Sequence, residues 1–162
     1  MTSAIERFVE AAVARGFRPE PRRFPEGTKT AADAARAVGC DVAQIVKSLV
    51  FMAGDRPVLA LTSGRNRVDT AKLAELLGAD DVRRATPEQA RFATGFAVGG
   101  TPPFGHPQPL AAYIDRELLR HEQVWAAAGT PDSVFPIAPK ELERLAGATE
   151  ADIVEASAGA AG

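Results

Sequence analysis

Cysteine and histidine are almost absent from this sequence of 162 residues, which contains one cysteine and two histidines. A lone Cys40 cannot form an internal disulfide, so the chain is compatible with a reducing compartment. With only His106 and His121 beside it, we expect no Cys/His metal site. Cys40 has no base partner nearby in the sequence, and free cysteines are usually simply packed. We therefore interpret it as a structural residue rather than a nucleophile.

Long apolar segments are also lacking. No run approaches the roughly 18–20 apolar residues of a membrane-spanning helix, and the first residues, MTSAIE, have neither the basic start nor the apolar core of a signal peptide. The G-x-G-x-x-G and G-x-x-x-x-G-K-[ST] fingerprints of nucleotide-binding loops are absent too. We therefore expect a cytoplasmic protein with no membrane partner, no metal and no cofactor.

The composition that is present is ordinary for one globular domain, but its charge is unevenly distributed. Hydrophobic residues make up 46% of the chain and charged residues 25%. The net charge is −2, yet residues 1–72 carry twelve Lys/Arg against eight Asp/Glu, and the remainder carries seven against thirteen. The basic half can contact a phosphate backbone despite the overall acidity; the alternative is solvated surface charge. The cations in question are Arg18, Arg22, Arg23, Lys29, Arg65, Arg67 and Lys72.

One apolar stretch carries a lysine near its middle. In residues 45–51 (IVKSLVF), apolar side chains occupy both alternating faces, which predicts a strand buried on both sides. Lys47 shares a face with Leu49 and Phe51, where an unpaired ammonium costs on the order of several kcal/mol. Its side chain must reach solvent, pair with a carboxylate, or face a cleft where an anion binds. An ion pair, with Asp132 as partner, is the structural alternative to a functional role.

Capping residues and apolar spacing predict helices over residues 3–16, 31–38, 69–78, 86–93 and 139–147. In the third of these, Leu73, Leu76 and Leu77 form the expected buried stripe. Strands are predicted over residues 45–53, 57–62, 81–85, 96–98, 109–115, 123–128 and 134–137, with the first two as a central hairpin and the last closing the sheet.

This order predicts a single α/β domain of mixed, α+β character. We expect helices to surround a strongly bent, partly barrel-like mixed sheet. The domain spans residues 1–155, and the small residues 156–162 are expected to form a frayed tail.

A glycine- and proline-rich loop is the second informative feature. In residues 99–103 (GGTPP), the two glycines permit close backbone approach and the two prolines stiffen the end of the loop. Such a loop can present backbone N–H groups to an oxygen. The alternative is a rigid surface turn between strands.

Four segments together resemble a known family: GTKTAADAA (27–35), QIVKSLVF (44–51), TSG (62–64) and TGFAVGGTPPFG (94–105). They look like the YbaK-like aminoacyl-tRNA deacylases, which are related to the editing domain inserted in bacterial prolyl-tRNA synthetases. The resemblance runs in order over about residues 5–150. The pairing of a strand lysine with a Gly-x-x-x-Pro loop about fifty residues later is more specific than either part alone.

The resemblance implies a free-standing hydrolase that cleaves the ester of mischarged tRNA, typically tRNA for proline, as trans-editing quality control. Its partners would be mischarged aminoacyl-tRNA and prolyl-tRNA synthetase, and no DNA partner is expected. In such relatives the matching lysine helps hold the tRNA 3′ end, and the loop orients the aminoacyl carbonyl. Carried over, the catalytic residues are Lys47, Gly99, Gly100 and Thr101.

The chemistry of the residues agrees with that assignment. One lysine on a rigid strand can position the terminal phosphodiester, and backbone donors near Gly99, Gly100 and Thr101 can stabilise a tetrahedral oxyanion. Water or a substrate hydroxyl can attack an activated ester, so the scarcity of histidine is no obstacle. Thr30 falls where cysteine-specific members place an aromatic residue, which argues against a cysteinyl preference.

Further residues are assigned to binding. The substrate-binding candidates are Thr30, Ser48, Pro102, Pro103 and Asp132, and the tRNA-binding candidates are Arg22, Arg23, Arg65 and Arg67. Three of these assignments have structural alternatives. Ser48 can be an ordinary strand residue, Asp132 can cap a turn instead of holding the substrate amino group, and His106 can be a loop residue instead of an acid/base group.

Two other functions remain open from the sequence. One is a non-catalytic tRNA- or RNA-binding or regulatory module with the same fold. The other is a hydrolase of a small ester unrelated to tRNA. Charge reversal at Arg65 and Arg67 separates these two, because phosphate contacts matter only for the nucleic acid.

Overall fold

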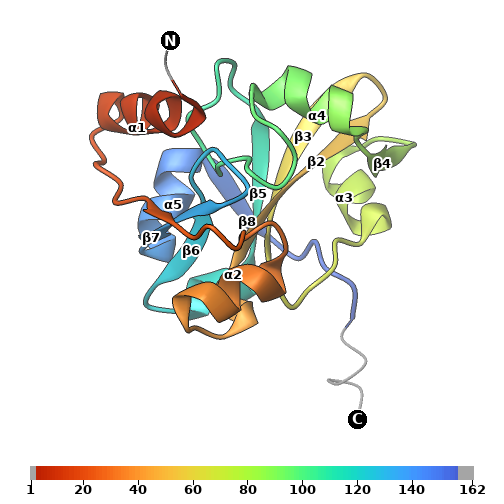
Figure 1. The fold of residues 1–162 in the computed structure, drawn as a ribbon. Helices are drawn as coiled ribbons and strands as arrows, with labels where there is room; N and C mark the ends of the chain where they lie inside the picture. The colour runs from red at the N-terminus through yellow and green to blue at the C-terminus, as the bar shows by residue number, and fades with distance from the viewer. Residues whose placement is uncertain (1–2, 157–162) are drawn as a thin grey trace.

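The computed structural model describes residues 3–156 and shows two β-sheets with helices packed around them (Figure 1). The larger sheet has the strand order β4-β2-β3-β5-β8 and the smaller sheet the order β1-β7-β6. The mixed α/β single domain predicted from the sequence is thereby confirmed. The barrel-like description is not, because neither sheet is closed. Residues 157–162, most of the expected tail, lie outside the described residues.

The strands are β1 (Arg22–Arg23), β2 (Val46–Ala53), β3 (Arg56–Ser63), β4 (Val82–Arg84), β5 (Ala111–Asp115), β6 (Val124–Ala127), β7 (Ser133–Ile137) and β8 (Ala148–Ala151). β2 and β3 form the expected antiparallel hairpin, in which Lys47 lies opposite Thr62. β5 then adds to β3 in parallel, and β8 adds in parallel to β5. The hairpin therefore lies at the centre of the larger sheet.

The first half of β2 has a strand partner on one side only. β3 pairs with the whole of β2, whereas β4 pairs only with its residues 51–53. At the other end, Ile45 forms an isolated bridge with Trp125 of β6, which joins the two sheets. An open stretch of β2 edge is left between β4 and the smaller sheet, and this opening positions the candidate site.

The α-helices are α1 (Ala4–Ala14), α2 (Ala31–Val38), α3 (Thr70–Leu77), α4 (Pro87–Thr94) and α5 (Pro139–Ala146), with short 3-10 helices η1 (Val42–Gln44) and η2 (Arg116–Arg120). Their starts follow from local chemistry. Thr30 caps α2 by accepting a hydrogen bond from Asp33 N at 3.1 Å. Thr86 and Gln89 form a reciprocal capping box at the start of α4. None of the helices in residues 3–156 is long and apolar enough to cross a membrane.

An aromatic cluster fixes the glycine-rich loop to the core. The Phe8 ring of α1 lies 4.8 Å from the Phe135 ring of β7 and 5.3 Å from the Phe104 ring, measured between centroids. All three side chains are buried. Because Phe104 directly follows residues 99–103, this cluster holds one end of that loop in place.

Four predictions about elements need correction. Residues 96–98 are not a strand; they enter a turn in which Gly100 N–H donates to Ala97 O at 3.0 Å. Leu76 is not buried but 46% exposed, whereas Leu73 is buried and Leu77 packs, partly buried, against the same core cluster. β7 does not close the main sheet but lies between β1 and β6 in the smaller one. β8 was missed altogether.

Candidate functional site

A pocket of about 590 Å³ lies along the open edge of β2 and is bounded by both sheets. β2, the start of α2, the region from β4 to α4, the glycine-rich loop and the smaller sheet all contribute to its walls. Among these residues, those from the sequence predictions are Thr30, Lys47, Ser48, Gly99 and Thr101. The strand lysine and the glycine-rich loop therefore line the same cavity.

Lys47 has no carboxylate partner. Among residues 3–156 it takes part in no ion pair, and its Nζ donates one hydrogen bond to the backbone carbonyl of Asn66. An ammonium group has three donors, so two remain for a ligand. The structural alternative for Lys47 fails, since its proposed partner Asp132 is paired with Arg23.

The surroundings of Lys47 disfavour its charge. Burial in the pocket wall lowers the pKa of Lys47 below its ordinary value, and the positive charges of Arg84 and Arg67 lower it further. Asp115 acts in the opposite direction. An anion bound beside the ammonium would stabilise the charged form, so the site is electrostatically suited to a negatively charged ligand.

The charge of the whole lining points the same way. Three cations, Lys29, Lys47 and Arg84, line the pocket, and none of its lining residues is Asp, Glu, His or Cys. The Arg84 guanidinium carbon lies 5.9 Å from the centroid of the Phe51 ring. Most of the remaining wall is apolar, including Trp125 and several alanines. The lining thus combines an anion-attracting region with apolar surface, and it offers no carboxylate or imidazole as a general base.

The glycine-rich loop meets the pocket through Gly99 and Thr101. Gly99 has φ +91°, a left-handed conformation that side chains disfavour, and the Lys29 stem packs where its Cβ would be. A Cβ on Gly100 would lie 2.7 Å from the Thr130 backbone, so the loop packs directly on the β6–β7 turn. The Gly100 N–H already bonds to Ala97 O. Of the three expected oxyanion donors, Gly99 and Thr101 are the two that line the pocket.

Thr30 and Ser48 line the pocket with different hydrogen-bonding states. The Thr30 hydroxyl caps α2. The Ser48 Oγ is buried and has no hydrogen-bond partner. Among residues 3–156 this hydroxyl has no partner, and because the oxygen is not accessible to solvent it does not face the open pocket.

The two prolines and His106 lie behind the loop rather than at the pocket. Pro102 and Pro103 are buried and are not among the pocket residues. His106 Nε2 donates to Pro102 O at 2.8 Å, and burial lowers the pKa of His106. Pro103 and His106 contribute to a second, smaller cavity of about 230 Å³. These residues brace the loop from the side opposite the pocket.

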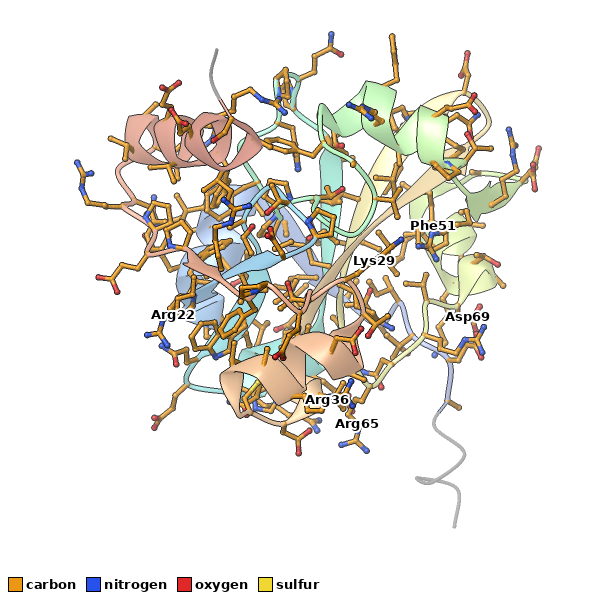
Figure 2. The ribbon with its side chains drawn as sticks, in the orientation of Figure 1. Arg22, Lys29, Arg36, Phe51, Arg65 and Asp69 are labelled. Carbon is orange, nitrogen blue, oxygen red and sulfur yellow. The ribbon has the colours of Figure 1, made fainter. Side chains whose placement is uncertain are left out.

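Asp132 and the predicted arginines occupy several different positions. Asp132 pairs with Arg23 at 3.1 Å and accepts a hydrogen bond from Thr130 Oγ1, and these partners lower its pKa, Thr130 contributing most. The Arg22 guanidinium lies 5.0 Å from the centroid of the pocket residue Trp125. Figure 2 shows Arg22 and Arg65 at separate edges of the molecule, both away from Lys29. Arg22 and Arg65 therefore lie apart from each other in this view.

Three residues near Lys47 were missed from the sequence: Asn66, Arg84 and Asp115. Asn66 and Asp115 are buried, at 7% and 2% exposure, and Asn66 Nδ2 donates to Asp115 Oδ2 at 2.9 Å. Asp115 follows an apolar strand in the sequence, and a carboxylate at that place was a usable signal. Arg84 carried no signal beyond its charge. Within residues 3–156, no group of three or more His, Cys, Asp or Glu side chains could hold a metal ion.

The model of the aminoacyl-tRNA editing domain family matches residues 25–145 of this chain. The chain belongs to this family, which confirms the resemblance noted from its motifs. It is 31% identical over 123 residues to the uncharacterized protein YwhH of Bacillus subtilis (strain 168), covering 75% of this chain and 78% of that protein.

The chain is also similar to part of a ligase and to a solved structure. It is 37% identical over 92 residues, or 57% of its length, to the proline--tRNA ligase of Nitratidesulfovibrio vulgaris (strain DP4), where the match spans only 16% of the ligase. It is also similar to a crystal structure described as a proposed trans-editing enzyme for prolyl tRNA synthetase. That similarity has a TM-score of 0.90 and 47% identity, and it covers 96% of this chain and 99% of the other.

Proposed function

We propose that this chain is a free-standing deacylase that hydrolyses the ester of mischarged aminoacyl-tRNA, with tRNA for proline as its substrate class. The observation that carries the proposal is the pocket in which three cations and no acidic side chain lie beside the glycine-rich loop. The 3′ end of a charged tRNA is complementary to this pocket. Its phosphodiester supplies the negative charge that the lining lacks, and the faces of its terminal adenosine can pack on the apolar wall. The proline preference rests on the relatives alone.

In the proposed reaction, water attacks the aminoacyl carbonyl and gives up a proton. The bond between the carbonyl carbon and the ribose oxygen then breaks, and that oxygen takes up a proton. The products are the free amino acid and the tRNA hydroxyl. Lys47 contacts the phosphodiester and fixes the ester in place. The backbone N–H groups of Gly99 and Thr101 face the developing oxyanion, and one such donor is typically worth about 10²–10³-fold in kcat.

The binding roles are divided between the remaining candidates. Thr30 contacts the aminoacyl group, and Arg22 beside Trp125 contacts the tRNA strand as it leaves the pocket. Arg67 lies near enough to Lys47 to affect its charge and is placed to contact a phosphate. Asp132 is an indirect contributor, since its bonds to Arg23 and Thr130 hold the turn on which Gly100 packs.

The test is a deacylation panel on tRNA for proline charged with alanine, cysteine, serine and proline. Wild type is compared with Lys47→Ala and with Lys140→Ala, an exposed lysine on α5 outside the pocket. We expect at least one ester to be cleaved faster than in buffer, with that rate strongly reduced but still measurable in Lys47→Ala and unchanged in Lys140→Ala. If no ester is cleaved but the tRNA still binds, the chain is a binding module and the proposal is wrong.

A parallel arm separates tRNA from small esters. Reversal of charge at Arg65 and Arg67 should raise KM for charged tRNA. KM should also depend less on salt, because a variant that makes fewer phosphate contacts releases fewer counterions from the tRNA when it binds. A small aminoacyl ester should be unaffected by the same change. Equal effects on both substrates would contradict a tRNA-specific role for these arginines.

A further inference from the structure

A network of hydrogen bonds through Asn66, Asp115 and Glu117, called the bracket, lies beside the ammonium group of Lys47. The Lys47 Nζ donates to the carbonyl of Asn66, which belongs to the loop that follows β3. The side chain of Asn66 points the other way, and its Nδ2 donates to Asp115 Oδ2 at 2.9 Å and to Glu117 Oε2. One residue thus connects the lysine to two carboxylates at the end of β5 and the start of η2.

Asp115 is the fixed point of this bracket. It is 2% exposed, and both of its oxygens are occupied. Oδ2 accepts from Ser63 N at 3.0 Å and from Asn66 Nδ2, while Oδ1 accepts from Glu117 N at 3.0 Å. A buried carboxylate with several donors is strongly held, and losing it would leave those donors unpaired. The loop that presents the Asn66 carbonyl is therefore fixed at its start and at its centre.

The same loop is confined from the other side. Gly64 N–H donates to Ile45 O at 2.7 Å, and a Cβ on Gly64 would lie 2.5 Å from Val42 O. The Ser63 hydroxyl donates to Ala43 O at 2.8 Å. Because Ile45 directly precedes β2, these bonds connect the loop to the strand that carries Lys47. Asp115 is therefore connected to Lys47 both through Asn66 and through the bonds that hold the loop against Ile45.

We infer that Asn66 and Asp115 are positioning residues for Lys47, in that the buried carboxylate holds the Asn66 carboxamide and the Asn66 carbonyl holds the ammonium at the pocket wall. The inference rests on the proposed function only for what Lys47 does to a substrate; the arrangement itself can be tested without one. It also explains how a half-buried ammonium with no carboxylate within pairing distance is kept in one place.

The charged groups around Lys47 allow a test in which two variants shift the pKa of Lys47 in opposite directions. The charged groups that affect it are Arg84 from β4, Arg67 from the loop and Asp115 from β5. Neutralising Asp115 should lower the pKa of Lys47, and neutralising Arg67 should raise it. General loosening of the fold would not shift the pKa in opposite directions for the two variants.

The first experiment is a pH titration of Lys47 by NMR on the full chain with ¹³C-labelled lysines. The Lys47 signal is identified by its loss in Lys47→Met. We expect Asp115→Asn to move the titration to lower pH and Arg67→Met to move it to higher pH. If Asp115→Asn does not fold, the second experiment, which leaves Asp115 in place, decides the inference. Titrations that coincide with wild type in these variants would overturn the inference.

The second experiment is a double-mutant cycle on deacylation. Asn66→Ala keeps the backbone carbonyl and every charge but releases the loop, and we expect kcat to fall by about 10²-fold, as for an ångström of misplacement. In a Lys47→Ala background, Asn66→Ala should have no further effect, because its whole contribution passes through the lysine. An equal loss in both backgrounds would show a structural role only. If wild type cleaves no ester, the proposed function fails while the NMR test still decides the bracket.

Discussion

Gly100 tests whether packing behind the glycine-rich loop sets the geometry of the pocket. It is not one of the glycines in the left-handed region, so replacing it with alanine adds no backbone strain of that kind. The added Cβ would lie 2.7 Å from both Cα and C of Thr130 and 2.9 Å from its N. Carbon atoms normally approach to about 3.5–4.0 Å. The loop and the β6–β7 turn must therefore separate by roughly 1 Å.

The size of the effect follows from this overlap. Forcing one extra carbon into a well-packed region typically costs about 1–3 kcal/mol. In a domain of this length, each kcal/mol lowers the melting temperature by roughly 2–4 °C. A displacement of about 1 Å in a positioning element can also lower kcat about 10²-fold. We expect Gly100→Ala to show both losses, measured by thermal unfolding and by single-turnover deacylation.

Gly54→Ala is the matched control. Gly54 lies in the β2–β3 turn with φ +63°, and nothing lies within 4 Å of where its Cβ would be. Alanine in that left-handed conformation costs about 1–2 kcal/mol, so stability should fall by a similar amount with deacylation unchanged. If Gly100→Ala melts with wild type, the packing argument is wrong. If it melts early but cleaves at the wild-type rate, the position of the loop does not govern the chemistry.

Three further changes have defined outcomes. Ser48→Ala removes a buried hydroxyl with no partner among the described residues and should raise the free energy of unfolding by about 1 kcal/mol in urea; a loss of stability would mean that the hydroxyl is paired. His106 has a lowered pKa, so below about pH 6.5 the unfolded chain binds more protons and wild type loses stability. His106→Gln keeps a donor for Pro102 O and should flatten that loss between about pH 6.5 and 5; an unchanged slope would contradict this. Thr86→Ala removes the cap of α4 and should cost about 1 kcal/mol, seen as a lower melting temperature with normal deacylation.

Elements whose signals are local could be predicted from the sequence. α2 and α4 start at Thr30 and Thr86 because those side chains cap them within three residues. Residues 96–98 show where apolar composition misleads. The Thr94 hydroxyl accepts from Phe96 N at 3.1 Å and donates to Ala90 O, so it binds backbone that a strand would need. β8 was missed because its parallel pairing with β5 bridges residues far apart in sequence.

The residues of the candidate site also divide into those with a local signal in the sequence and those that depend on distant partners. Lys47 and the glycine-rich loop could be chosen because each has an unusual residue pattern of its own. The bracket could not, since Asn66 bonds to a carboxylate 49 residues away and neither residue is unusual alone. The basic face suggested by the sequence stays a prediction for a related reason. Clustering in sequence does not fix direction, and Arg22 and Arg65 project at separate edges of the molecule (Figure 2).

The features that work against stability are concentrated around the pocket. Lys47 is half-buried with other cations near it, Ser48 has an unpartnered hydroxyl, and Gly99 is held in a left-handed conformation. Thr62, directly opposite Lys47 on β3, is also buried without a hydrogen-bond partner. Elsewhere the chain follows the rules of a stable fold, with capped helices and an aromatic core. A fold under selection for stability alone has no reason to keep these exceptions together. Their common location supports a site kept for a ligand, which would supply the missing negative charge beside Lys47.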